Sequence, residues 1–202
     1  MIKTVLFDLG NVIIPLDFTR CHAAMVEAGC PMQAAEVQER IAGSGLVGRF
    51  EEGKIGAKDF VRETARILDI QMSYEQFCEL WSMIFLPEAL VPESMLRGLR
   101  ERYRMLLLSN TNEIHFTLAK DRYPHLRHFD GFVLSYEVGV MKPKPAIYRE
   151  ATRRAVCEAG ECLFIDDREE NVEAARREGM DAVLFTSLAQ LEDDMRTRRM
   201  EW

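Results

Sequence analysis

Short runs of consecutive apolar residues alternate with longer stretches of helical periodicity along most of the chain. The apolar runs predict buried strands at 5–7, 105–108, 132–134, 163–165 and 182–185. Uninterrupted apolar strands are typical of parallel sheets that are covered by helices on both faces, so the pattern predicts an α/β fold. Crossover helices are expected at 111–120, 145–156 and 168–178, and Gly179 would end the last of them.

The first interval between strands departs from this spacing, because about a hundred residues separate the first strand from the second. A structureless loop of that length is implausible in a compact domain. Helical patterns recur within it at 18–28, 32–41, 57–68 and 74–85. We therefore expect a Rossmann-like core with helices on both faces, formed by residues 1–14 and 88–202, and an inserted all-helical cap subdomain, formed by residues 15–87.

Composition narrows the possible partners. The chain has 202 residues, of which 48% are apolar, and this is enough to form a substantial core. Its 26 basic and 33 acidic residues give a net charge of -7, which argues against nucleic-acid and anionic-membrane partners. No apolar run approaches the roughly 20 residues that span a bilayer. We expect a soluble cytoplasmic protein, either a monomer or a weak homo-oligomer, whose five cysteines form no CxxC pair and stay reduced.

Polar residues capable of chemistry stand at the ends of three predicted strands. Asp8 follows the first strand, Ser109 the second, and Asp166 and Asp167 the fourth. Because parallel sheets bind ligands outside the carboxyl ends of their strands, these side chains should converge on one site. Lys142 follows another candidate strand and should join them. Three carboxylates, a hydroxyl and an ammonium group suit a divalent cation together with a phosphoryl group.

The carboxylates have distinct expected roles. A carboxylate at a strand end can attack phosphorus when a cation reduces the repulsion between the two anions, which makes Asp8 the candidate nucleophile of an aspartyl-phosphate mechanism. Mg²⁺ prefers oxygen ligands and needs one or two further carboxylates from a neighbouring strand. Asp166 and Asp167 supply them.

The phosphoryl oxygens need hydrogen-bond donors and a fixed positive charge. Ser109 offers a hydroxyl, Asn110 and Thr111 offer backbone N–H groups at an expected helix start, and Lys142 offers an ammonium group. Each residue also has a purely structural alternative. Ser109 and Thr111 could be ordinary helix caps, Lys142 could lie on the surface, and Asp167 has the capping-box spacing to the glutamate three residues later. The joint order and spacing favour a shared site over these separate alternatives.

The motifs resemble those of the haloacid dehalogenase (HAD) superfamily of hydrolases. They are Phe-Asp-Leu-Gly-Asn-Val at 7–12, Ser-Asn-Thr at 109–111, Lys-Pro at 142–143, and Asp-Asp at 166–167 with Asn171 following. The helical insertion resembles the first type of cap in that superfamily, so the resemblance covers essentially the whole chain. The opening motif is similar to that of a bacterial sugar-phosphatase branch of the superfamily, which includes α-glucose-1-phosphate phosphatase.

This resemblance implies a Mg²⁺-dependent phosphatase that acts on a small phosphorylated metabolite. The expected substrates are sugar phosphates such as a hexose 1-phosphate. It implies that Asp8 is the nucleophile and that Mg²⁺ is bound by Asp8, the backbone carbonyl of Gly10 and Asp167, with Asp166 assisting. It also implies that Ser109, Asn110 and Lys142 hold the phosphate.

One position departs from the family pattern. Most phosphatases of the superfamily carry a second Asp two residues after the nucleophile as general acid, and this chain has Gly10 there. Losing a positioned acid costs about a hundred- to ten-thousand-fold in rate. A sugar 1-phosphate has a comparatively acidic leaving hydroxyl, so the departure favours an anomeric phosphate. Asn11 could orient water, and Glu51, in the Gly-flanked segment 48–53, could reach the site on closure or lie in a solvated turn.

Three function classes stay open on the sequence. The first is the phosphatase. The second is a 2-haloacid dehalogenase, which would use Asp8 but has no use for a metal, and the Asp166–Asp167 pair counts against it. The third is a catalytically weak binding or regulatory homologue that lacks the acid. The histidines follow no metal or triad spacing, and we expect surface or packing positions for His22, His115, His125 and His128.

Overall fold

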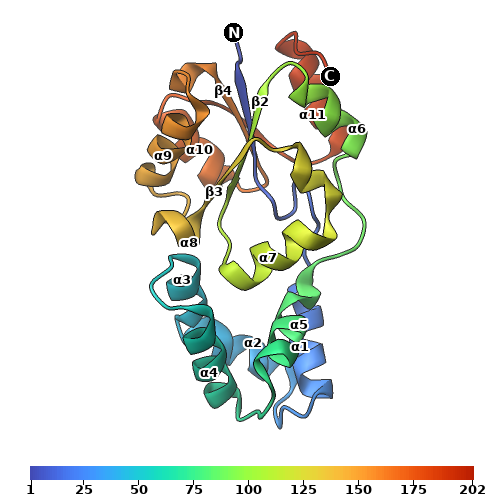
Figure 1. The fold of residues 1–202 in the computed structure, drawn as a ribbon, viewed down its shortest axis with the longest axis vertical. Coiled ribbons are helices and arrows are strands. Elements are labelled where there is room, and N and C mark those ends of the chain that lie inside the picture. Colours follow the sequence, from blue (N-terminus) through green and yellow to red (C-terminus); the bar gives the residue numbers. More distant parts are fainter.

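The computed structural model describes all 202 residues and is built on one five-stranded parallel sheet (Figure 1). Its strands are β1 (Thr4–Phe7), β2 (Arg104–Ser109), β3 (Gly131–Leu134), β4 (Cys162–Asp166) and β5 (Asp181–Leu184). The order β3-β2-β1-β4-β5 places β1 in the centre, between β2 and β4. The five strands that the apolar runs predict are confirmed, and so is the α/β fold class.

Side chains alternate between two apolar clusters, one on each face of the sheet. Val5 and Phe7 join the cluster under α6, α7 and α11, whereas Leu6 between them joins the cluster under α9 and α10. This alternation follows from the two-residue repeat of a strand, and it buries both faces of β1. The helices are α6 (Glu93–Arg100), α7 (Glu113–Arg122), α9 (Pro145–Ala155), α10 (Glu169–Arg177) and α11 (Leu188–Thr197). Shorter turns are η2 (Pro124–His128), α8 (Ser135–Val138) and η3 (Ala159–Glu161).

Residues 18–84 form a second group of helices at the end of the molecule that lies opposite the termini (Figure 1). They are α1 (Phe18–Glu27), α2 (Ala34–Gly43), α3 (Leu46–Glu51), α4 (Ala57–Leu68), α5 (Tyr74–Trp81) and η1 (Ser82–Ile84). These helices share a separate apolar cluster in which Phe60 stacks on Phe50 and contacts Phe77 and Trp81. These four aromatic residues therefore pack the interior of the segment.

Two chain segments join these helices to the sheet, and they run side by side. Leu16 and Phe85 form an antiparallel bridge. The backbone N–H of Asp17 donates to the carbonyl of Ile84 at 2.8 Å, and the N–H of Leu86 donates to Pro15 at 3.1 Å. The chain thus leaves the sheet and returns to it at one place.

Some elements differ from the sequence prediction. The pattern predicts neither α3 nor α6, and α7 begins two residues later than expected because the Asn112 side chain accepts a hydrogen bond from the His115 N–H and caps the helix. The charged C-terminal helix α11 packs on the core through Leu191 and Met195, which are buried. None of the helices combines the length and apolar character needed to cross a membrane.

Candidate active site

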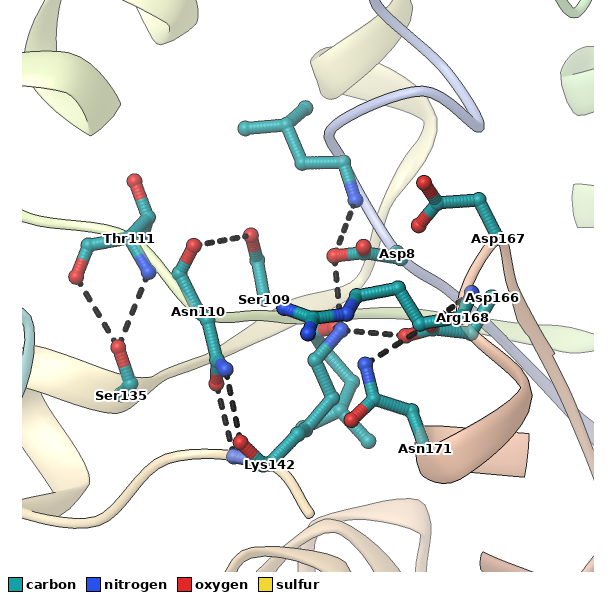
Figure 2. Close-up of polar contacts among 12 residues, drawn as sticks. Asp8, Ser109, Asn110, Thr111, Ser135, Lys142, Asp166, Asp167, Arg168 and Asn171 are labelled. Atoms are coloured by element: carbon teal, nitrogen blue, oxygen red, sulfur yellow. Dashed lines mark hydrogen bonds and ion pairs between the residues drawn. The ribbon is translucent and has the colours of Figure 1, made fainter. Parts of the chain in front are cut away.

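The carboxyl ends of β1, β2 and β4 bring the predicted polar residues together (Figure 2). Asp8 follows β1, Ser109 ends β2, and Asp166 ends β4 with Asp167 directly after it. Asp8, Asp166 and Asp167 each present a carboxylate oxygen within 4.8 Å of the others. The central strand pairing therefore produces an acidic cluster that the separate motifs could only suggest.

Lys142 lies within this cluster and is almost wholly buried. Its Nζ stands 2.9 Å from Asp8 Oδ1 and 2.6 Å from Asp166 Oδ2, and it also donates to the Leu108 carbonyl at 3.0 Å. All its hydrogens therefore have acceptors within the protein, and the surface alternative for Lys142 is wrong. One ammonium group faces three carboxylates, so the ionised cluster has an excess of two negative charges.

Asp166 is fully buried, and its oxygens accept several donors. Oδ2 accepts from Lys142, while Oδ1 accepts from the Arg168 N–H at 2.9 Å and from Asn171 Nδ2 at 2.9 Å. Asp167 instead forms one side-chain contact, in which Asn11 Nδ2 lies 3.3 Å from its Oδ2. The N-cap of α10 is Arg168, so Asp167 does not form the capping box that its spacing allows.

Burial and repulsion shift the titration of this cluster. Burial raises the pKa of Asp8 to about 7, against the attraction of Lys142, and the charge of Asp166 adds to the rise. The pKa of Asp167 is also raised, mainly by burial and in second place by the charge of Asp166. For Lys142, burial opposes the charged form, but the two carboxylates outweigh it and raise its pKa. A cation would relieve the repulsion among the carboxylates.

The segment after β2, residues 109–111, is expected from the sequence to offer two backbone N–H groups to the phosphate, and only one of them is free. The Thr111 N–H donates to Ser135 Oγ at 3.0 Å, so this amide is already used and the prediction that it faces an anion is wrong. The Asn110 side chain binds the backbone of Lys142 twice, with Nδ2 donating to the carbonyl at 2.9 Å and Oδ1 accepting from the N–H at 2.8 Å. The backbone N–H of Asn110 donates no hydrogen bond within the protein. Ser109 is buried and caps no helix.

A cavity of about 310 Å³ opens over these residues. Sequence reasoning missed two groups of residues in its lining: the apolar residues Leu16, Phe18, Val47, Ile84 and Phe85, and the polar residues His115 and Arg168. Little in the sequence marks them, because they come from several elements whose packing decides which side chains face inward. An adjoining cavity of about 330 Å³ shares Phe18, Val47, Glu51, Ile84 and His115 with the first.

Helix α3 contacts α8, the short helix that follows β3, and brings Glu51 to both cavities. Glu52 is buried beside it and pairs with Lys144, which follows β3, and with Lys54. At Gly53 the chain has a φ of 65°, and a Cβ there would lie 2.2 Å from the Tyr136 carbonyl oxygen. Only glycine fits this close approach, which fixes the C-terminal end of α3 against α8.

Gly10 occupies the position where the superfamily pattern has its acid. A Cβ at Gly10 would lie 2.6 Å from Leu16 Cδ1, so the leucine side chain fills the space next to the glycine. Asn11 is also committed, because its Oδ1 accepts from the Leu16 N–H at 3.0 Å and its Nδ2 faces Asp167.

Comparisons with known proteins agree with this site. A family model described as haloacid dehalogenase-like hydrolase matches residues 2–179. A D-ribitol-5-phosphate phosphatase from Bacteroides thetaiotaomicron is 27% identical over 187 residues, 90% of each chain. A crystal structure of a HAD family enzyme from that organism, in complex with magnesium and inorganic phosphate, is 29% identical, with coverage of 93% of this chain and 96% of its own and a TM-score of 0.83.

A HAD-like family hydrolase from Porphyromonas gingivalis is 28% identical, with full coverage of both chains and a TM-score of 0.85. These similarities extend over both the sheet and the inserted helices. Since the family match covers most of the sequence, and the sheet order and the acidic cluster agree with it, the chain belongs to the haloacid dehalogenase-like hydrolases.

Proposed function

We propose that this protein is a Mg²⁺-dependent phosphatase that hydrolyses a small phosphorylated metabolite through an aspartyl-phosphate intermediate on Asp8. The main support is the position of Asp8, which lies at the end of the central strand with Lys142 against one oxygen and two further carboxylates nearby. Such a carboxylate is held in place for attack on phosphorus, and the neighbouring cation limits its repulsion of the phosphate.

The donor set fits Mg²⁺. Three carboxylates within 4.8 Å of one another offer hard oxygen ligands, and their excess negative charge would be balanced by a divalent cation. We assign Asp8, the Gly10 carbonyl and Asp167 as ligands of the ion. Asp166 would assist them, and its hydrogen-bond donors hold its carboxylate in position. When bound, the ion would withdraw charge from the phosphoryl oxygens and allow the two anions to approach.

The phosphate would be held from the other side by Ser109, Asn110 and Lys142. The Asn110 backbone N–H is free to donate, and its side chain holds the Lys142 backbone in place. A hydroxyl, a backbone donor and a fixed ammonium group can stabilise the negative charge that spreads over the phosphoryl oxygens during transfer.

The substrate class follows from the cavity and from the relatives. A cavity of about 310 Å³ is at the small end of ligand sites, which supports a small metabolite. We propose a sugar or sugar-alcohol phosphate. A hexose 1-phosphate fits a site without an acid at Gly10, and the similarity to a D-ribitol-5-phosphate phosphatase supports a phosphorylated polyol. The acidic cluster counts against metal-free dehalogenation. The presence of the candidate nucleophile, metal and phosphate residues counts against a purely regulatory role.

The test is a screen of sugar and sugar-alcohol phosphates for release of inorganic phosphate, with and without Mg²⁺. The parent should act only with the metal. Asp8→Asn should reduce release by more than a thousandfold while the protein stays folded, because the amide is nearly isosteric but not nucleophilic. Asp59→Asn, on the exposed surface of α4, is the matched control and should behave like the parent. Turnover by Asp8→Asn within tenfold of the parent would contradict the mechanism.

A further inference from the structure

The proposed function leaves the leaving oxygen without a proton donor, and the sheet offers none at the expected place. Leu16 fills the space beside Gly10, and Asn11 is held by Asp167 and by the backbone of Leu16. An amide is also a poor acid. A donor for the leaving group must therefore come from another part of the cavity wall.

Three titratable groups of that wall are outside the proposed metal and phosphate sites: His115, Arg168 and Glu51. His115 Nδ1 lies 3.1 Å from Asn112 Nδ2, and its Nε2 lies 3.1 Å from the Trp81 carbonyl oxygen, so both ring nitrogens have partners. An arginine stays protonated in proteins and is no proton donor at neutral pH. Glu51 is the group that remains.

The placement of Glu51 suits a proton donor. It is the last residue of α3, partly buried, and its carboxyl group makes no hydrogen bond or ion pair within the protein. It lines both the cavity over Asp8 and the adjoining cavity, whereas Asp8 and Lys142 line only the first. In-line attack by Asp8 places the ester oxygen on the opposite side of the phosphorus, so this oxygen would point into the cavity that Glu51 lines.

We propose that Glu51 is the general acid and base of this reaction. As Asp8 Oδ bonds to phosphorus, the bond from phosphorus to the ester oxygen breaks, and the oxygen takes its electron pair and the Glu51 proton. The carboxylate of Glu51 then accepts a proton from the water that attacks the phosphorus. The Asp8–phosphorus bond breaks, which releases inorganic phosphate and restores both carboxyl groups. This inference rests on the proposed phosphatase function.

The surroundings of Glu51 agree with this role. Burial raises its pKa to about 7, the charge of Arg168 opposes the rise, and the charge of Asp8 adds to it. His22 on α1 and His115 on α7 share the adjoining cavity, and burial lowers the pKa of both, so neither places a positive charge beside Glu51 at neutral pH. A group that titrates near the working pH can both give and accept a proton.

The first experiment compares Glu51→Gln with the parent on two kinds of substrate. The rate with a sugar or sugar-alcohol phosphate that the parent hydrolyses should fall by about a hundred- to ten-thousand-fold. Formation of the phosphoenzyme from 4-nitrophenyl phosphate should change by less than tenfold, because nitrophenolate leaves without a proton. Glu39→Gln, exposed on α2, should match the parent with both substrates.

The second readout separates catalysis from a structural effect. With 4-nitrophenyl phosphate, Glu51→Gln should release a burst of nitrophenol and accumulate phosphate on Asp8, detectable by mass spectrometry after acid quenching, because water attack has lost its base. In the parent, kcat/KM for the natural class of substrate should fall above pH of about 7, where Glu51 loses its proton, and this fall should be absent in Glu51→Gln.

The outcomes distinguish the two proposals. A parent that releases no phosphate from any ester overturns both. If the parent is active and depends on Asp8, but Glu51→Gln matches it on sugar phosphates or accumulates no phosphoenzyme, the phosphatase proposal stands and the role of Glu51 is overturned.

Discussion

Single buried charges determine how the nucleophile is held. Asp166 has donors on both oxygens, and one of them is Lys142, which also contacts Asp8. Removing one partner of such a group leaves a charge buried and unpaired, and this typically costs about 3–5 kcal/mol. The network therefore fixes Asp8 in position, because any other arrangement of these side chains would leave a buried charge unpaired.

The space beside Gly10 gives a prediction for restoring the usual acid. Gly10→Asp alone should destabilise the protein by roughly 1–3 kcal/mol, because its Cβ meets Leu16 Cδ1 at 2.6 Å and the leucine must move. Adding Leu16→Ala should relieve this crowding. The double variant, made in the Glu51→Gln background, should recover at least tenfold in phosphate release from sugar phosphates, which a phosphate-release assay measures.

The control is Leu16→Ala in the Glu51→Gln background, which lacks the new carboxylate and should recover nothing. Recovery by the control would show that cavity size limits the reaction. In that case proton transfer would no longer explain the loss in Glu51→Gln.

At this scale, the sequence predicts the reactive residues better than their surroundings. Asp8, Ser109, Asp166 and Asp167 end buried strands, so sheet geometry alone predicts that they meet. The pattern gives no sign that Ser135 takes the Thr111 amide, because that depends on how β3 ends beside β2. Arg168 and Leu16 are likewise cavity residues only by virtue of tertiary packing.

Of the two helices that the periodicity fails to predict, α3 and α6, α3 contributes more to the proposed chemistry. It is six residues long and contains a glycine, so it offers too few turns for a repeat to show. Longer elements such as α4 agree with their predicted bounds, 57–68, because an apolar face recurs over several turns. Short elements whose position depends on a contact elsewhere are the ones that sequence reasoning misses.

The contact at Gly53 gives a prediction for α3. Gly53→Ala should destabilise the protein by about 1–2 kcal/mol through its left-handed backbone, and it should also push the loop away from the Tyr136 carbonyl. A displacement of about 1 Å can cost a hundredfold in rate, so hydrolysis of sugar phosphates should fall by about that factor. Urea unfolding and steady-state kinetics measure the two effects.

Gly48→Ala, within α3, is the matched control. No atom lies within 4 Å of a Cβ at Gly48, so this change should stabilise the protein by about 0.5–1 kcal/mol and leave the rate unchanged. Equal rates for Gly53→Ala and the parent would show that the position of the α3 tip does not matter for turnover.

On the scale of the whole molecule, the acidic cluster links stability to the metal. Mg²⁺ at a hundred times its Kd should stabilise the folded parent by about 2.7 kcal/mol, seen as a rise in Tm. Asp167→Ala should lose this rise. Without metal it should be at least as stable as the parent, because burial and the charge of Asp166 disfavour the ionised form of Asp167.

The control is Asp59→Ala on the exposed surface of α4, which should keep the rise in Tm. Chelation should abolish phosphate release by the parent, and 2-haloacids should not be hydrolysed with or without metal. Release of halide in the absence of metal would favour the dehalogenase alternative, and an unchanged Tm response in Asp167→Ala would contradict the assigned ligand set.

The bridge between Leu16 and Phe85 has a consequence for how this protein could be remodelled. Since the chain departs and returns at adjacent, hydrogen-bonded positions, residues 17–84 need not span any distance across the sheet. Another helical segment whose ends lie equally close could be spliced between these two residues without altering a single strand pairing. Such a chimera would keep the attacking group and exchange only the wall that faces the leaving group, so substrate preference could be transplanted as a unit.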